Sequence, residues 1–198
     1  MKHLKRIVTA LTTAALVVCA ILYVPSNWFT PVIAVLLIAT TIEYFMLASK
    51  KTSVISAHGF AVNLVGVLVL AFAFGTLWTI ATNTVFGGNI ILLYVIAVVK
   101  LSDMGGFALG MAFGKHKMCP SVSPNKSWEG LFGSVLASVL MSCIFVYIIG
   151  VPKWFPLWKT IGVGVVGALV GTAGDLTESA FKRWVGVKDS GTFMPAGL

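Results

Sequence analysis

Long apolar stretches separated by short polar segments dominate the pattern of this chain. Most of them approach the ~20 residues that a helix needs to cross the roughly 30 Å hydrocarbon core of a bilayer. The first also fits a signal peptide, but no small-residue cleavage site follows it. The pattern therefore predicts an all-α fold, a polytopic integral membrane helical bundle with about six transmembrane spans: Ile7–Val24, Thr30–Ala48, Phe60–Ala81, Asn89–Leu109, Leu131–Gly150 and Thr160–Ala173.

The composition agrees with a lipid environment. Of 198 residues, 58% are hydrophobic and 10% are charged, whereas soluble domains carry about 25% charged residues. The three cysteines are isolated from one another and from any histidine at ligand spacing, so neither a disulfide framework nor a zinc site is expected: Cys19, Cys119 and Cys143. We expect N-terminal hydrophobic spans over residues 1–82 and a catalytic-type membrane region with cytoplasmic motifs over residues 83–198.

The positive charges are distributed unevenly between the predicted loops. The net charge is +8, and eleven of the fourteen cations fall in loops on one side of the predicted spans. This asymmetry follows the positive-inside rule and predicts that both termini are cytoplasmic. The membrane orientation explains the positive net charge, so nucleic acid is not an expected partner. The expected location is the inner (cytoplasmic) membrane of a bacterium, with these cations inside: Lys2, Lys5, Arg6, Lys50, Lys51, Lys115, Lys117, Lys126, Lys182, Arg183 and Lys188.

Acidic residues are scarce, and their positions suggest chemistry. Five of the six acids lie in the second half of the chain, in or beside segments that this orientation places at the cytoplasmic face: Asp103, Glu129, Asp175, Glu178 and Asp189. A carboxylate inside a span costs about 2.5–3.5 kcal/mol on insertion scales, which makes it a functional hypothesis. Lys100 stands three residues before Asp103 and could instead neutralise it. The sequence leaves both interpretations open.

Asp175 and Glu178 are spaced i, i+3 if the last span continues as a helix past Gly174. Two carboxylates on one helix face suit Mg²⁺, which prefers a few carboxylates plus substrate phosphates. Lys182 and Arg183 follow one turn later, so the acids could hold the metal while the cations hold phosphates. A solvated amphipathic tail would produce the same charge pattern.

Four short motifs are more specific than these counts. They begin at Asp103 (D-M-G-G-F-x-x-G-x-x-F-G-K), at Ser123 (S-P-N-K-S-W-E-G), at Gly174 (G-D-L-T-E-S) and at Ser179 (S-A-F-K-R-x-x-x-x-K-D-S-G-x-x-M-P). In this order over about 95 residues, they resemble the signature of the phosphatidate cytidylyltransferases (CDP-diacylglycerol synthases). The N-terminal spans match that family only in being hydrophobic.

The resemblance implies that CTP and phosphatidate, a membrane lipid, react to CDP-diacylglycerol and pyrophosphate, with Mg²⁺ as cofactor. It implies metal binding by Asp103, Asp175 and Glu178, and a nucleotide or phosphate loop formed by Ser123, Lys126, Ser127 and Glu129, with Ser179 also a substrate-binding residue. The catalytic set it implies is Asp175, Lys182, Arg183, Lys188 and Asp189. Glycines spaced for close helix approach, on the fourth and sixth spans, allow a homodimer.

The family signature continues after its proline as x-H-G-G-x-x-D-R-x-D, whereas this sequence reads Met194-Pro195-Ala196-Gly197-Leu198. Three explanations are consistent with this difference: the sequence is a fragment, a frameshifted product, or a shortened, non-catalytic paralogue. Two further alternatives are a CTP-using enzyme for an isoprenoid lipid, similar to CDP-archaeol synthase or polyprenol kinase, and a small transporter. Transport predicts polar groups at the bilayer midplane, whereas these acids cluster toward one face.

Overall fold

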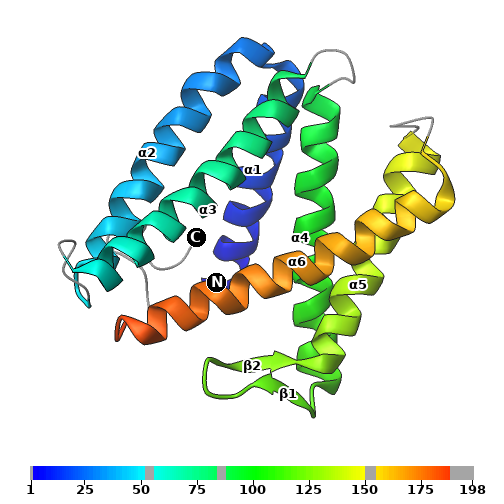
Figure 1. The fold of residues 1–198 in the computed structure, drawn as a ribbon. Helices are drawn as coiled ribbons and strands as arrows, with labels where there is room; N and C mark the ends of the chain where they lie inside the picture. Colours follow the sequence, from blue (N-terminus) through cyan, green and yellow to red (C-terminus); the bar gives the residue numbers. More distant parts are fainter. Residues whose placement is uncertain (1, 52–55, 84–87, 150–154, 188–198) are drawn as a thin grey trace. The chain divides into compact units, whose positions relative to one another are not determined.

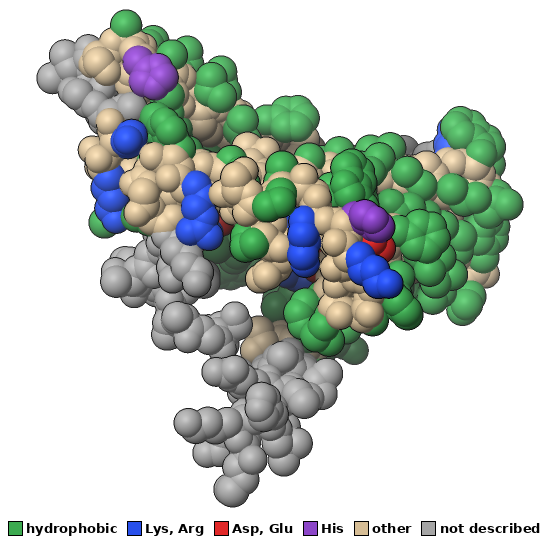
Figure 2. All heavy atoms as spheres, turned by 90° about the horizontal axis from the view of Figure 1, so that it is seen from below, with side chains coloured by type: hydrophobic (Ala, Val, Ile, Leu, Met, Phe, Trp, Pro, Cys, Tyr) green, Lys and Arg blue, Asp and Glu red, His purple; other side chains and the backbone are tan. Residues whose placement is uncertain are grey.

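The computed structural model describes residues 2–51, 56–83, 88–149 and 155–187, with side chains from Thr12 onward. Five helical segments in this part of the chain are long and apolar enough to cross a membrane: Ser26–Ala48, Ala57–Thr82, Gly88–Phe113, Trp128–Ile149 and Leu157–Trp184. Among the described side chains of the first helix, Thr12–Tyr23 form a shorter apolar stretch. The prediction of an all-α membrane protein is confirmed, and broad hydrophobic surface flanks exposed basic side chains (Figure 2).

The chain divides into two compact units, one up to Leu92 and one from Leu93 onward through the last helix. The elements, in chain order, are α1 (Lys2–Tyr23), a 3₁₀ turn (Ser26–Trp28), α2 (Phe29–Ala48), α3 (Ala57–Thr82), α4 (Gly88–Phe113), β1 (Lys117–Cys119), β2 (Ser123–Ser127), α5 (Trp128–Cys143), a π-helical extension of α5 (Ile144–Ile149) and α6 (Leu157–Trp184) (Figure 1).

In the first unit, α2 and α3 run side by side in opposite directions (Figure 1). Trp78 Nε1 donates to Thr30 Oγ1 at 3.0 Å near one end of the pair. Tyr44 OH donates to the Val62 carbonyl at 2.7 Å nearer the other end, where its ring covers Gly66. A hydrogen bond between helices is favoured in lipid because the alternative is an unsatisfied polar group in hydrocarbon. These two bonds fix the register of α2 against α3.

In the second unit, α6 returns along α5, and polar side chains join the two helices. Ser138 Oγ donates to the Gly164 carbonyl, and Ser142 Oγ donates to the Thr160 carbonyl at 2.9 Å. Since the Ser142 hydroxyl proton is used in this way, Tyr94 OH on α4 donates to Ser142 Oγ, at 2.6 Å. All three helices of the unit are therefore connected through buried hydroxyl groups.

Helices α4 and α5 pack closely because both present small residues. A side chain on Gly106 would meet Ser134 Oγ, and a side chain on Gly110 would lie 3.5 Å from the Cα of Gly130. These α4 glycines, which the sequence marks as a helix-packing face, are therefore covered by α5 of the same chain. Their contacts need no second copy of the protein.

Two features go beyond the sequence-based expectations. Helix α6 runs from Leu157 to Trp184, so it continues well past the predicted end at Ala173 and carries both Asp175 and Glu178. The segment between α4 and α5, predicted as a loop, contains a short antiparallel hairpin in which Lys117 pairs with Ser127. The two strands show no alternation of apolar and polar residues, so the sequence pattern does not predict the hairpin. Backbone pairing between the strands forms it.

Candidate functional site

A cavity of about 300 Å³ lies in the second unit, between α4, the hairpin, α5 and α6. Five residues that the sequence marks as candidates line it: Asp103, Ser123, Lys126, Ser127 and Asp175. They come from three separate motifs, and the first and last of them, Asp103 and Asp175, are 72 residues apart in the sequence. The structure thus brings the cores of these motifs to one place. The remaining lining residues are Gly106, Phe107, Met118, Asn125, Gly130, Leu131, Ser134 and Thr172.

Strand β2 and the first turn of α5 position the hydroxyl and ammonium groups of this cavity. Ser127 ends β2 in an extended conformation and is the N-cap of α5, where its Oγ accepts from the Gly130 backbone N at 3.2 Å. Such a cap satisfies one of the unpaired N–H groups at a helix start. The Ser127 side chain is therefore buried and already engaged, and its structural role would stand even without a ligand.

Glycines on α4 and α5 allow the cavity to form. Gly106, one turn after Asp103, faces Ser134, while Gly110 faces the Ser127 hydroxyl and Gly130. Larger residues at these positions would meet α5 and its N-cap residue Ser127. Gly106 thus serves helix packing and also lines the cavity beside Asp103.

Lys126 bridges the hairpin to α6. Its Nζ lies 3.0 Å from Asp175 Oδ2 and 3.4 Å from the Thr172 carbonyl oxygen. The Lys126 side chain is 25% exposed and the Asp175 side chain 57% exposed. Because one partner is largely open to solvent, the pair contributes about 0–1 kcal/mol to stability. The ammonium group is therefore available to exchange its carboxylate partner for a phosphate oxygen.

Asp103 on α4 is close enough to Asp175, Lys126 and Lys100 for their charges to act on it. No ion pair joins Lys100 to Asp103 among the residues that the structure describes. The sequence alternative in which these two neutralise each other on one helix face therefore has no direct contact to support it. Asp103 faces the same cavity as Lys126 and Asp175 instead.

The other predicted residues of α6 lie outside this cavity. Glu178 pairs with Lys182 one turn further along α6, with Oε1 and Nζ 2.6 Å apart. Arg183 Nε reaches the Val122 carbonyl in the hairpin turn at 3.5 Å, a long contact. Ser179 is half-buried on α6 and is not among the cavity-lining residues. Lys188 and Asp189 lie outside the described residues.

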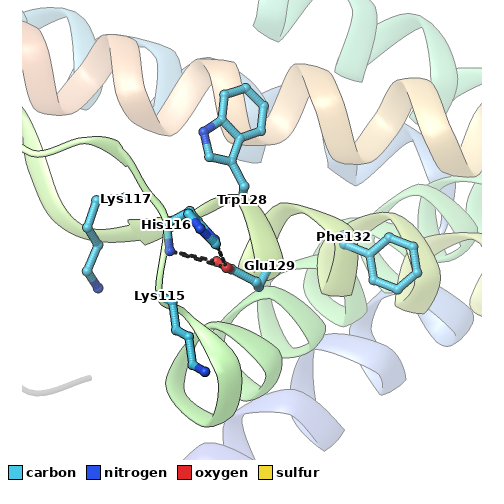
Figure 3. Close-up of a pocket in the computed structure, with 6 residues that line it drawn as sticks. All are labelled: Lys115, His116, Lys117, Trp128, Glu129 and Phe132. Carbon is cyan, nitrogen blue, oxygen red and sulfur yellow. Dashed lines mark hydrogen bonds and ion pairs between the residues drawn. The ribbon is translucent and has the colours of Figure 1, made fainter.

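Glu129 faces away from the cavity, toward His116. Its Oε1 lies 2.6 Å from His116 Nδ1, and both carboxylate oxygens accept from the His116 backbone N, at 3.2 and 3.3 Å (Figure 3). The Trp128 backbone N also donates to the His116 carbonyl, at 3.0 Å. These bonds tie the end of α4 to the start of α5 at the base of the hairpin. His116 was not a candidate in the sequence, where a single histidine thirteen residues away gives no sign of this pairing.

Asp103 and Asp175 are the residues of this cavity that could hold a metal ion. Among the described residues no group of three or more His, Cys, Asp or Glu side chains has the geometry to hold an ion. Mg²⁺, however, is commonly bound by one or two carboxylates together with substrate phosphates and water. Two carboxylates from facing helices, beside a cation able to take phosphate, fit that arrangement, whereas Glu178 stands apart from them.

Comparison with known proteins extends what the geometry indicates. The model of the cytidylyltransferase family matches residues 60–197. Proteins named phosphatidate cytidylyltransferase from Staphylococcus aureus (strain COL) and Staphylococcus epidermidis (strain ATCC 35984) are each 39% identical to this chain over 104 residues. The protein of that name from Staphylococcus haemolyticus (strain JCSC1435) is 38% identical over 104 residues.

Each of these alignments covers 52% of this chain and 39% of the relative, so the chain spans about two fifths of the length of these curated relatives. The family match covers more than half of the chain and includes α4, the hairpin, α5 and α6. The cavity with Asp103, Lys126 and Asp175 lies within the matched residues, and the chain belongs to the cytidylyltransferase family.

Proposed function

We propose that this protein catalyses cytidylyl transfer from CTP to phosphatidate, which yields CDP-diacylglycerol and pyrophosphate. The observation that carries the proposal is the convergence of Asp103, Lys126 and Asp175 on one cavity in a membrane-spanning unit. The relatives named phosphatidate cytidylyltransferase support the choice of reaction. We place the protein in the inner membrane of a bacterium, with both termini cytoplasmic.

The reaction joins two phosphates. An oxygen of the phosphatidate phosphate attacks the α-phosphorus of CTP, a new P–O bond forms, and the bond between the α-phosphorus and its bridging oxygen to the β-phosphate breaks. Pyrophosphate leaves with that oxygen. Such transfers need positioning and neutralisation of charge more than covalent help from the protein. The cavity offers a cation and polar groups for this purpose.

Lys126 is the residue that we assign to a CTP phosphate. Its ammonium group is held by an exposed carboxylate and a carbonyl oxygen, both of which can take water instead when a phosphate arrives. Ser123 and Asn125 lie on the same strand and line the same cavity, where they can donate to nucleotide oxygens. We also assign Arg183, whose Nε lies near the hairpin turn, to phosphate binding, although it does not line the cavity.

Asp103 and Asp175 would hold Mg²⁺. When bound, the ion would neutralise charge on the phosphates and orient them for in-line attack. Release of Asp175 from Lys126 would then leave each group with an oppositely charged partner: the carboxylate with the ion, and the ammonium with phosphate. Glu178 could support this site from one turn further along α6 if it left Lys182. The homodimer stays a prediction.

The test is turnover of labelled CTP by the purified chain in detergent micelles with phosphatidate and Mg²⁺. Asp175→Asn removes a charge from the cavity, and Glu43→Gln removes one from α2 in the other unit. We expect the first variant to lose CDP-diacylglycerol formation and the second to retain it, both with unchanged thermal midpoints. Full activity of Asp175→Asn would refute the metal assignment. Product formed only with a polyprenol or an archaeal ether-lipid acceptor would favour the isoprenoid alternative.

A further inference from the structure

A second depression, about 820 Å³, lies at the base of the hairpin (Figure 3). It shares no lining residue with the cavity of Asp103 and Asp175. Its lining comes from the turn between α4 and β1, from the first residue of β1 and from the first two turns of α5: Lys115, His116, Lys117, Trp128, Glu129 and Phe132. This combination of cations and aromatic rings is not used by the proposed reaction.

The position of the depression along the membrane normal follows from its neighbours. Phe113 is the last residue of the α4 span, and Lys115 follows two residues later, while Trp128 begins the α5 span. The lining therefore lies where two helices of membrane-spanning length end and begin, which indicates a position near the membrane surface. Trp128 is 58% exposed and Phe132 is 65% exposed, which matches the place of aromatic side chains at a membrane interface.

The charge of the depression is positive. Lys115 and Lys117 are exposed, and no ion pair is recorded for either within the described ranges. The Glu129 carboxylate, the one acid in the lining, is engaged by His116 through the ring and the backbone N. The two ammonium groups are therefore left to attract an anion from outside the protein.

We propose that this depression binds an anionic phospholipid, whose headgroup phosphate lies between Lys115 and Lys117 and whose acyl chain lies along Trp128 and Phe132. Lipid provides the anion because the site opens where phospholipid phosphates are concentrated, and its apolar side continues into the hydrocarbon region. A juxtamembrane lysine contributes about 1 kcal/mol to binding anionic lipid. Loss of both lysines should therefore weaken the preference for anionic lipid by about thirtyfold, at tenfold per 1.36 kcal/mol.

This proposal depends on the membrane location and not on the reaction, so it can fail or hold independently of the proposed function. The experiment measures quenching of tryptophan fluorescence by brominated phosphatidylglycerol, compared with brominated phosphatidylcholine, for the full chain in phosphatidylcholine bilayers. Trp128→Phe keeps an aromatic ring in the lining but removes the indole whose fluorescence reports on the site. Lys115→Gln with Lys117→Gln removes its charge. Lys50→Gln with Lys51→Gln removes an exposed lysine pair that follows another span.

We expect excess quenching by the anionic lipid in the wild type, its loss in Trp128→Phe, and a shift of about thirtyfold to higher lipid fraction in the Lys115 and Lys117 variant, from the same per-lysine contribution. The Lys50 and Lys51 variant should shift far less, because neither lysine lines the depression. Equal effects of the two lysine pairs would overturn the proposal, because diffuse surface charge would then explain the preference. Quenching by brominated phosphatidate without quenching by phosphatidylglycerol would also overturn it, since the depression would then be an entrance for substrate.

Discussion

Replacing Gly133 by alanine tests the contact that holds α4 and α5 together. A methyl group at this position would meet the Gly105 carbonyl oxygen, and would lie 2.8 Å from Leu109 Cβ and 3.0 Å from the Gly105 carbonyl carbon. Two of these atoms belong to the α4 backbone, which cannot turn aside as a side chain would. The helices must therefore separate or slide to admit the methyl group.

The expected magnitude combines two opposing effects. Overpacking of a close contact costs about 1–3 kcal/mol, while alanine is favoured over glycine in a helix by about 1 kcal/mol. Gly171 on α6 provides the matched control, because a methyl group there would meet nothing within 4 Å. The difference between Gly133→Ala and Gly171→Ala isolates the steric cost, so we expect about 1–3 kcal/mol between the two variants.

Thermal unfolding in detergent, followed by tryptophan fluorescence, measures this difference. At about 2–4 °C per kcal/mol for a chain of this size, Gly133→Ala should melt at least about 2 °C below Gly171→Ala. Cytidylyl transfer should also fall in Gly133→Ala, because Gly105 lies two residues after Asp103 on α4 and its displacement moves that carboxylate. Equal midpoints for the two variants would refute the close packing of α4 on α5.

Two further variants separate binding from stability in the cavity. Lys126→Gln should change the thermal midpoint little, because its partner Asp175 is largely exposed. A charge-assisted hydrogen bond to phosphate is worth about 1.5–3 kcal/mol, so kcat/KM for CTP should fall by roughly 10–150-fold in this variant. Unchanged kinetics would show that Lys126 does not bind a CTP phosphate. Ser127→Ala should lose about 0.5–2 kcal/mol of stability as the cap of α5 disappears, with Ser127→Thr as the control that keeps a hydroxyl. A midpoint of Ser127→Ala equal to that of the wild type would show that the cap contributes nothing.

The approximate limits of the spans follow from local sequence. A stretch of about 20 apolar residues has few alternatives to a membrane helix, because in lipid each backbone N–H and C=O must be satisfied within the segment. The prediction of the last span nevertheless ended at Ala173, eleven residues before the helix ends at Trp184. Hydropathy falls where Asp175 and Glu178 begin, although the helix continues, so apolar length alone underestimates an amphipathic extension.

Five of the predicted site residues line one cavity between α4, the hairpin and α6, but the sequence predicted none of the contacts between them. Lys126 and Asp175 are 49 residues apart in sequence and meet at 3.0 Å. Nothing local to either residue encodes that contact, since it depends on how α6 returns along α5. The hydroxyls of Ser138 and Ser142 fix this packing. In the sequence, these two serines cannot be told apart from other small residues of a span.

Glu129 shows most clearly that the sequence motif does not predict side-chain direction. Its place in the Ser123 motif put it beside Lys126 and Ser127, whereas the structure turns its carboxylate to His116. Adjacent positions at the junction of a strand and a helix point in different directions, because side chains alternate along the strand and rotate by about 100° per residue along the helix. The sequence by itself thus determined the membrane class, the span positions and the motifs, all of which depend on composition over short windows. Only the tertiary structure decided which side chains share a cavity, because that depends on helix packing and on the direction of each side chain.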